Sequence, residues 1–381
     1  MNLVSAIYFH PEAFPPTLYA VGELSQFFDK IYLLHRPHMQ GKWQFNSNVE
    51  LIPSGKLMGI KDQEQSSVIK KIGFFLGFTL RLLYLIKKHK PKVVLLYDSM
   101  PLFSYFLIKQ IVGYKPVLWY HNHDIIEKSV SRKLSIGWLA GVFEPKMLPY
   151  LNIFSLPAEE RKVYFPMSQF KGSYFFIPNL PLKSFYKQYY KPKQKPEQEI
   201  TLLYQGMIGQ NHAFEEIIEL LDPKISNMLL SLTLIGPVNE IYKKSLVDLA
   251  KKYNVTDQLH WIPRLLYSEL PRATMKYHIG LAIHNIENVQ YSTGGTASNK
   301  IYEYAACGLP VLYFDNQHYS KHLSKYKWAV PTSLTKRSLI NAVELINSNY
   351  VELSIAARSD FENELNFEKH FKKIIDNLKL L

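Results

Sequence analysis

The residues best suited to chemistry lie between Ser292 and Leu312. Small residues at 292–298 precede a predicted helix that begins near Ser298, and Lys300 lies in its first turn. Backbone N–H groups of small residues can approach an anion closely, and a helix N-terminus carries partial positive charge. Glu303 lies one turn further along, where a carboxylate can accept hydrogen bonds from ribose hydroxyls. The segment predicts a diphosphate cradle; the alternative is a capped helix with Lys300 and Glu303 paired on its surface.

This segment resembles the donor-nucleotide site of retaining, family 4 glycosyltransferases of the GT-B fold. The matching residues are Ser298-Asn299-Lys300, Glu303-Tyr304 and Cys307-Gly308-Leu309-Pro310-Val311, which follow the pattern S-x-K-x-x-E-Y-x-A-x-G-x-P-V. The resemblance implies an α/β chain of two Rossmann-like, doubly wound domains that face each other across a cleft. It also implies transfer with retention by front-side displacement, in which the leaving diphosphate helps to deprotonate the acceptor.

Two departures from the family pattern remove expected contacts. Met207 and His212 stand where the family often has an arginine and a lysine for the diphosphate, and Gly295 replaces the first of two paired glutamates, eight residues before Glu303. Gly236-Pro237 is either a wall of the nucleotide pocket or a plain turn. We expect the donor to be held by the following residues: Gly294, Gly295, Thr296, Ser298, Asn299, Lys300, Glu303, Gly206, His212 and Arg264.

A second group of polar residues follows the predicted strand at 117–120. There, His121, His123 and Asp124 lie at the carboxyl edge of the first predicted sheet. By resemblance to the family's first-domain histidine motif, His123 is the first candidate to contact the transferred sugar and His121 the second, and we place both with Lys300 in the catalytic group. A metal site and a structural turn are the alternatives, although no further Cys or His cluster completes a ligand set. Asp98 either contacts the acceptor or caps a helix.

Strand-like and helix-like segments alternate along the chain, which predicts parallel, doubly wound sheets. The predicted strands are 3–9, 31–34, 49–52, 93–97, 117–120, 152–155, 174–177, 201–204, 230–235, 260–262, 279–283 and 311–314. In the first half, the predicted helices are 17–28, 65–89, 102–112, 135–148 and 158–164.

The polar, proline-bearing stretch between Lys183 and Glu199 divides the chain. It predicts an acceptor-binding domain at 1–185, a linker at 186–199 and a nucleotide-sugar-binding domain at 200–360. Apolar spacing predicts a last helix at 361–381, which by resemblance crosses back to the first domain.

Positive charge is concentrated in the first half of the chain. The chain of 381 residues has a net charge of +13, and residues 1–190 hold 23 Lys and Arg against 12 Asp and Glu, a net charge of +11. The apolar segment 72–86 is interrupted by Arg81, is too short to span a membrane, and lies among basic residues. It is either an anionic-membrane contact or a core helix with solvated basic ends. We expect a lipid-linked or surface-polysaccharide acceptor, and no nucleic-acid partner because no nucleic-acid motif accompanies the charge.

Several classes of protein lack their sequence signatures here. There is no Asp-x-Asp, no Gly-x-Gly-x-x-Gly and no Walker A motif, so we expect a transferase that needs no metal and no cofactor. The single cysteine, Cys307, and the absence of a leader before the first strand predict a cytoplasmic protein, peripheral to the inner face of the plasma membrane. The alternatives are a GT-B sugar-nucleotide epimerase and a non-catalytic membrane assembly protein on a degenerate GT-B scaffold.

Overall fold

The computed structural model describes residues 1–125, 133–221, 228–284 and 292–380. Within it, the chain forms two compact units. The first comprises Met1–Pro178 with His370–Leu381, and the second comprises Asn179–Lys369.

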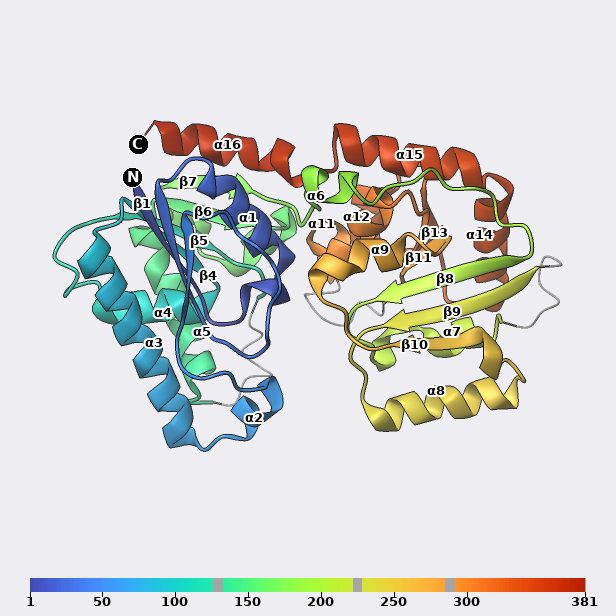
Figure 1. Cartoon of the computed structure of the whole chain (residues 1–381), viewed down its shortest axis with the longest axis horizontal. Coiled ribbons are helices and arrows are strands. Elements are labelled where there is room, and N and C mark those ends of the chain that lie inside the picture. Colours follow the sequence, from blue (N-terminus) through green and yellow to red (C-terminus); the bar gives the residue numbers. More distant parts are fainter. Residues whose placement is uncertain (126–132, 222–227, 285–291, 381) are drawn as a thin grey trace. The chain divides into compact units, whose positions relative to one another are not determined.

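The first unit is built on a seven-stranded parallel sheet (Figure 1). Its order is β3-β2-β1-β4-β5-β6-β7, so the chain starts in the middle of the sheet and builds outward in both directions. The central strand β4 is buried at every position because helices cover both faces of the sheet. The strands are β1 (Asn2–Ile7), β2 (Lys30–His35), β3 (Val49–Pro53), β4 (Val93–Tyr97), β5 (Val117–His121), β6 (Ile153–Leu156) and β7 (Ser173–Phe176).

The helices of this unit include the long helix α3, which packs against β1, β2 and α4. Phe371 near the C-terminus stacks on Trp119 of β5, with ring centroids 5.9 Å apart, so the last residues belong to this unit. The helices are α1 (Pro15–Ser25), α2 (Ile60–Gln65), α3 (Val68–His89), α4 (Ser99–Ile108), α5 (Ile136–Met147) and the C-terminal part of α16 (Phe367–Lys379).

The second unit repeats the same winding with six parallel strands in the order β10-β9-β8-β11-β12-β13. The strands are β8 (Glu199–Gln205), β9 (Leu229–Ile235), β10 (Leu259–Ile262), β11 (Ile279–Ala282), β12 (Val311–Phe314) and β13 (Ala329–Thr332). The helices are α6 (Lys183–Lys187), α7 (Phe214–Ile218), α8 (Glu240–Lys252), α9 (Leu270–Thr274), α11 (Gly294–Ala297), α12 (Asn299–Ala306), α13 (Gln317–Leu323), α14 (Lys336–Ser348) and α15 (Tyr350–Asn363).

The predicted class, two doubly wound α/β units, is confirmed. Two local predictions differ from the structure. Residues 158–164 form a 3₁₀ segment (Glu159–Tyr164) rather than an α-helix, and residues 186–199, expected to be a linker, form part of the second unit. Tyr186, at the start of that stretch, is buried and its hydroxyl lies 3.1 Å from that of Tyr267. Aromatic packing therefore ties this polar stretch to the unit.

Among the described residues, no helix is both long enough and apolar enough to cross a membrane.

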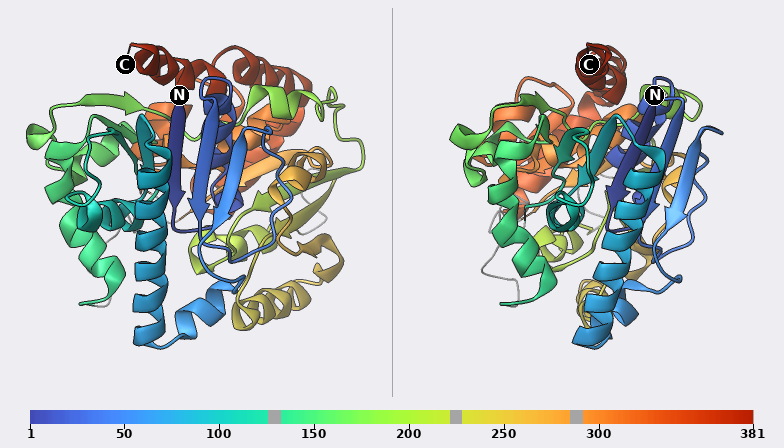
Figure 2. Two further views of the ribbon diagram at one scale, coloured as in Figure 1. Left: turned by 60° about the vertical axis from the view of Figure 1, so that its left-hand side comes forward. Right: turned by 90° about the vertical axis from the view of Figure 1, so that its left-hand side faces the viewer.

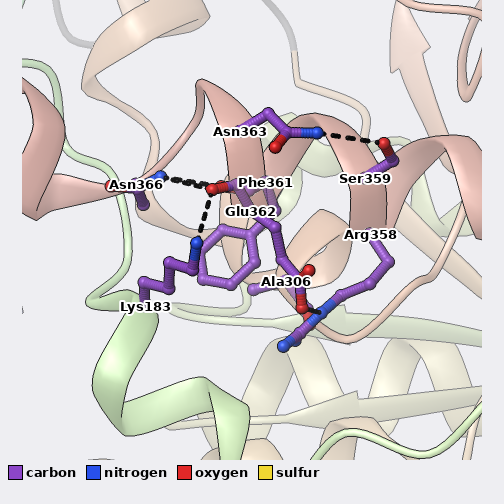
Figure 3. Close-up of polar contacts among 8 residues, drawn as sticks. All are labelled: Lys183, Ala306, Arg358, Ser359, Phe361, Glu362, Asn363 and Asn366. Atoms are coloured by element: carbon purple, nitrogen blue, oxygen red, sulfur yellow. Dashed lines mark hydrogen bonds and ion pairs between the residues drawn. The ribbon is translucent and has the colours of Figure 1, made fainter.

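A buried arginine holds the C-terminal end of α12, the helix that carries Lys300. Figure 3 shows the Arg358 guanidinium donating from Nη1 to the carbonyl of Ala306 and from Nε to Glu362 Oε1, the latter at 2.8 Å. Lys183 Nζ donates to the Glu362 carbonyl at 2.9 Å and so links α6 to α15. The last carbonyls of a helix have no hydrogen-bond partner within it, so Arg358 supplies the missing donor to Ala306 and holds the end of α12 in place.

Replacement of this arginine tests that anchoring. Arg358→Met leaves the Ala306 carbonyl without its donor in a buried place, and we expect a loss of about 2–3 kcal/mol in the free energy of unfolding. Lys327→Met is the matched control, because its ion pair with Glu352 is exposed on both sides and should contribute less than about 1 kcal/mol. Urea unfolding of both variants gives the comparison, and equal losses would contradict the anchoring role.

Candidate active site

The second sheet reverses its winding between β8 and β11. β8 and β11 are neighbours, and the strands that follow them in the chain, β9 and β12, lie on opposite sides of this pair. Ligands of such sheets bind outside the carboxyl ends of the strands at this point. Gly206 follows β8 directly, and His284 lies two residues after β11. His284 was not among the residues predicted from the sequence, although the winding order of the strands points to it.

Lys300 reaches the end of β8 from the first turn of α12. Its Nζ lies 3.1 Å from the Tyr204 hydroxyl and 4.4 Å from the centre of the Tyr204 ring. A methyl group placed on Gly206 would lie 3.5 Å from the same Nζ, so the ammonium also borders the Gly206 backbone. Burial lowers the pKa of Lys300 to about 7, against a smaller opposing effect of Glu303. The ammonium is therefore positioned by an aromatic hydroxyl and short of solvation, and an anion would stabilise its charge.

Two histidines lie beside this lysine. The His212 and His284 rings are 5.1 Å apart, and the His212 ring is 5.0 Å from that of Tyr204. His212 Nδ1 lies 2.9 Å from the Gly209 carbonyl. Burial, followed by the charge of Lys300, lowers the pKa of His212 to about 4 and that of His284 well below its usual value. Both imidazoles are thus neutral at pH 7 without a ligand.

Glu303 is nearly inaccessible, with 4% of its surface exposed. Its Oε2 accepts from Gln205 Nε2 at 2.6 Å, and the carboxyl also bonds to Tyr267. Burial raises the pKa of Glu303 to about 7 despite these bonds. The surface pairing of Lys300 with Glu303 that we considered is therefore not the arrangement found, since the carboxyl lies in a buried network.

The raised pKa of Glu303 makes the stability of the free protein depend on pH. Between pH 4.5 and about 7 the folded state keeps a proton on Glu303 that the unfolded state has lost. This proton's contribution to the free energy of unfolding is therefore lost as pH rises from 4.5 through 7. Glu303→Gln keeps an acceptor for Gln205 and removes this loss. We expect the variant to match the wild type near pH 4.5 and to be more stable by about 1–3 kcal/mol at pH 8. Thermal unfolding across this pH range is the measurement, and a constant difference would contradict the assignment.

Two glycines at the ends of β8 and β9 let their turns approach closely. Gly206 and Gly236 have φ of 138° and 147°, which side chains rarely adopt. A Cβ on Gly236 would lie 1.8 Å from the Gly206 carbonyl oxygen. The backbone conformation next to Lys300 therefore requires glycine at 236. This requirement is more specific than that of the plain turn considered as an alternative.

The expected glycine loop before α12 is a helical turn in the structure. Gly294, Gly295 and Thr296 are buried in α11. A Cβ on Gly294 would lie 2.2 Å from the Tyr319 hydroxyl, and one on Gly295 would lie 2.8 Å from the His322 ring. These glycines thus allow α13 to pack closely, and such packing is their observed role.

The remaining predicted contacts are spread along this edge of the sheet. Ser298 and Asn299 are half-buried at the start of α12, and the Ser298 side chain makes no capping hydrogen bond. Arg264 is exposed just after the edge strand β10. The Met207 side chain, in place of the expected arginine, is 72% exposed.

In the first unit, the predicted sugar-contacting histidine is buried between aromatic rings. His123 is stacked between Phe14 and Tyr97, with centroids at 5.0 and 5.1 Å, and its Nε2 lies 2.9 Å from Thr17 Oγ1. Burial lowers its pKa well below the usual value, so the imidazole is neutral. Its Nδ1 is buried without a hydrogen-bond partner in the described part of the chain.

Neighbouring groups fix this histidine from several sides. The Asp98 carboxylate accepts from the His123 backbone N–H at 2.6 Å, and Arg161 donates to the His123 carbonyl. Asp98 has a φ of 63° and caps this loop with its side chain rather than the helix that follows it. His121 packs edge-on against His123 at 4.6 Å, and its Nδ1 lies 2.9 Å from Ser155 Oγ.

Among the side chains that the structure describes, no group of three or more His, Cys, Asp or Glu residues is arranged to hold a metal ion.

The two doubly wound units both contain the strand order 3-2-1-4-5-6, and their fold is of the GT-B class, as in the similar solved structures that follow. Solved structures agree over almost the whole chain. Sucrose-phosphate synthase from Thermosynechococcus elongatus has a TM-score of 0.71 at 11% identity, covering 100% of this chain and 98% of that one. HepE from Anabaena, solved with UDP and glucose, has a TM-score of 0.68 at 10% identity and full coverage of both chains.

WaaG, a glycosyltransferase involved in lipopolysaccharide biosynthesis, has a TM-score of 0.64 at 12% identity over 98% of each chain. The matches also include a UDP-N-acetylglucosamine 2-epimerase. Identities this low show the fold alone. No protein-family model and no curated protein matches this sequence.

Proposed function

We propose that this protein is a retaining glycosyltransferase that moves a sugar from a nucleotide-diphosphate donor to an acceptor hydroxyl. The observation that carries the proposal is the placement of Lys300 at the carboxyl end of β8, at the start of α12 and beside two histidines. A desolvated ammonium next to a helix N-terminus suits a diphosphate better than a neutral ligand.

Lys300, together with His212 and His284, would supply the positive charge that the family pattern normally takes from an arginine and a lysine. We propose that Lys300 binds the donor diphosphate as the full cation, and that the approach of the dianion raises the pKa of His212 and His284 so that they donate hydrogen bonds. This arrangement compensates for the exposed Met207 and needs no metal ion. We retain Glu303 as the ribose contact, because a carboxyl with a pKa near 7 can donate as well as accept.

The reaction we propose has no covalent intermediate. The bond from the anomeric carbon to the diphosphate breaks while the acceptor oxygen attacks from the same face, and the departing phosphate oxygen takes the acceptor proton. Lys300 stabilises the charge that develops on the leaving group. In the first unit, His123 is our first candidate for the contact with the transferred sugar, and His121 is the second.

The acceptor we propose is a lipid-linked or surface-polysaccharide glycan, met by a cytoplasmic protein at the inner face of the plasma membrane. The basic first half of the chain supports this choice, because such acceptors lie at an anionic surface. HepE was solved with UDP and glucose, which favours a uridine donor as the first to test.

A panel of sugar nucleotides tests the proposal. One donor of the panel should release its nucleoside diphosphate slowly by hydrolysis, and faster when a suitable glycan acceptor is present. The epimerase alternative, kept open by the fold of a matching epimerase, predicts product without any acceptor and no transfer. The non-catalytic scaffold predicts neither hydrolysis of any donor nor transfer to any acceptor.

A further inference from the structure

Helix α3 buries only one of its faces in the first unit. The buried residues recur at helical spacing, and all of them except Thr79 form part of the apolar core beneath the helix. They are Phe75, Phe78, Thr79, Leu82, Leu85 and Ile86. Figure 2 shows α3 in front of the strands, with its N-terminal half extending past their ends. The opposite face is left uncovered by this unit.

That uncovered face is apolar rather than polar. Five large side chains recur every three or four residues and so lie along one side of the helix, called here the α3 stripe. Their exposed fractions are 83% for Ile69, 43% for Ile72, 48% for Leu76, 64% for Leu80 and 48% for Tyr84. Gly73 and Gly77 lie next to them, and a Cβ on either would meet nothing within 4 Å. A stripe over four turns of one helix exceeds the scattered exposed residues of an ordinary surface.

Basic residues follow the stripe along one border. Lys70, Arg81 and Lys88 are separated by eleven and seven residues, close to whole numbers of helical turns, and all three are exposed. Residues 68–92 hold seven Lys and Arg and no Asp or Glu. Arg81 and Lys88 each lie over the Tyr84 ring, at 5.6 and 5.3 Å. Cations therefore lie directly beside the apolar stripe.

We propose that α3 docks this protein on the surface of an anionic lipid bilayer, lying in the plane of the interface with the α3 stripe among the acyl chains. The basic row would then meet the lipid phosphates, as in amphipathic helices that bind membranes without crossing them. A second copy of this chain fits less well, because pairing two α3 faces would bring two rows of cations together with no acidic partner in the helix. Of the two interpretations of the segment 72–86, we therefore favour the anionic-membrane contact for its exposed face.

Vesicle co-sedimentation of the full chain tests the docking. We expect binding to phosphatidylcholine vesicles that contain phosphatidylglycerol, weak binding to phosphatidylcholine alone, and release by high salt. Leu76→Gln with Leu80→Gln should lower the partition coefficient by about tenfold or more, because two exposed side chains would no longer leave water. Lys70→Gln with Arg81→Gln and Lys88→Gln should abolish the preference for the anionic vesicles.

Ile241→Gln provides the matched control for the apolar change. Ile241 is 82% exposed on α8, with lysines at 243 and 244, but is not part of a stripe. We expect unchanged binding. An equal loss in this variant, or no loss in the Leu76 and Leu80 variant, would overturn the proposal.

A probe on the stripe shows which surface touches the lipid. The native cysteine, Cys307, is buried, so Leu80→Cys can be labelled selectively with an environment-sensitive fluorophore. Its emission should shift to the blue on anionic vesicles, whereas a label on Ile241→Cys should not shift. Sedimentation with vesicles without a shift at residue 80 would mean that another surface binds lipid. Concentration-dependent dimerisation lost in the Leu76 and Leu80 variant, without vesicle binding, would assign the face to a second copy.

These measurements require neither donor nor acceptor. Failure of vesicle binding would therefore leave the proposed sugar transfer standing, and failure of nucleotide binding would leave the membrane contact standing.

Discussion

Lys300→Ala should slow sugar transfer by about 100-fold or more, the loss expected when one preorganised charge at a developing anion is removed. The structure gives a reason for so large an effect. The ammonium is held at 3.1 Å by the Tyr204 hydroxyl and is poorly solvated, so it needs little reorganisation when the diphosphate leaves. Steady-state kinetics with the donor found in the panel provide the measurement.

Lys244→Ala is the control for this prediction, since Lys244 is exposed on α8 of the same unit. Its activity should equal that of the wild type. The wild-type kcat/KM should also fall as pH rises above about 7, where Lys300 of the free enzyme loses its proton. The residual kcat/KM of the alanine variant should not show this fall. Full activity of Lys300→Ala would remove this lysine from the mechanism.

Gly236→Ala should disrupt the proposed donor site through the backbone. The new methyl group would lie 1.8 Å from the Gly206 carbonyl oxygen, and the φ of 147° is unfavourable for alanine. Either the turn after β9 or the turn after β8 must move, and the latter borders Lys300. We expect a loss of about 3 kcal/mol or more in the free energy of unfolding, together with loss of nucleotide binding.

Gly22→Ala is the matched control, because Gly22 lies within α1 and a Cβ there would meet nothing within 4 Å. Alanine is the better helix former, so this variant should gain about 0.5–1 kcal/mol. Urea unfolding and a nucleotide-binding assay on both variants complete the test. Normal nucleotide affinity in Gly236→Ala would show that the two glycine turns do not shape the site.

The strands and their winding could be predicted because their residues form short apolar runs bounded by polar turns. The strand β13 was missed, since Ala329–Thr332 is short and carries Pro331. Proline removes a backbone donor, and the structure places this strand at the edge of the sheet, where that loss is tolerated.

The surroundings of Lys300 could be predicted less completely than the fold. The motif predicted a helix start near Ser298 with Lys300 in its first turn, and α12 begins there, because a helix start is a local feature. The position of His284 beside His212 could not be predicted, because the pairing of β11 with β8 brings it there. The burial of Glu303 was missed for the same reason, since Gln205 and Tyr267 come from distant segments. Likewise, the exposure of the α3 stripe depends on which elements pack beside it.

Calorimetric titration with UDP, GDP and ADP tests most directly whether the second unit binds a nucleoside diphosphate at Lys300. We predict that one of them binds with a submillimolar Kd near pH 6, and that its affinity falls about tenfold or more by pH 9, as the lysine loses its proton. Absence of binding by all three nucleotides at both pH values would contradict the account.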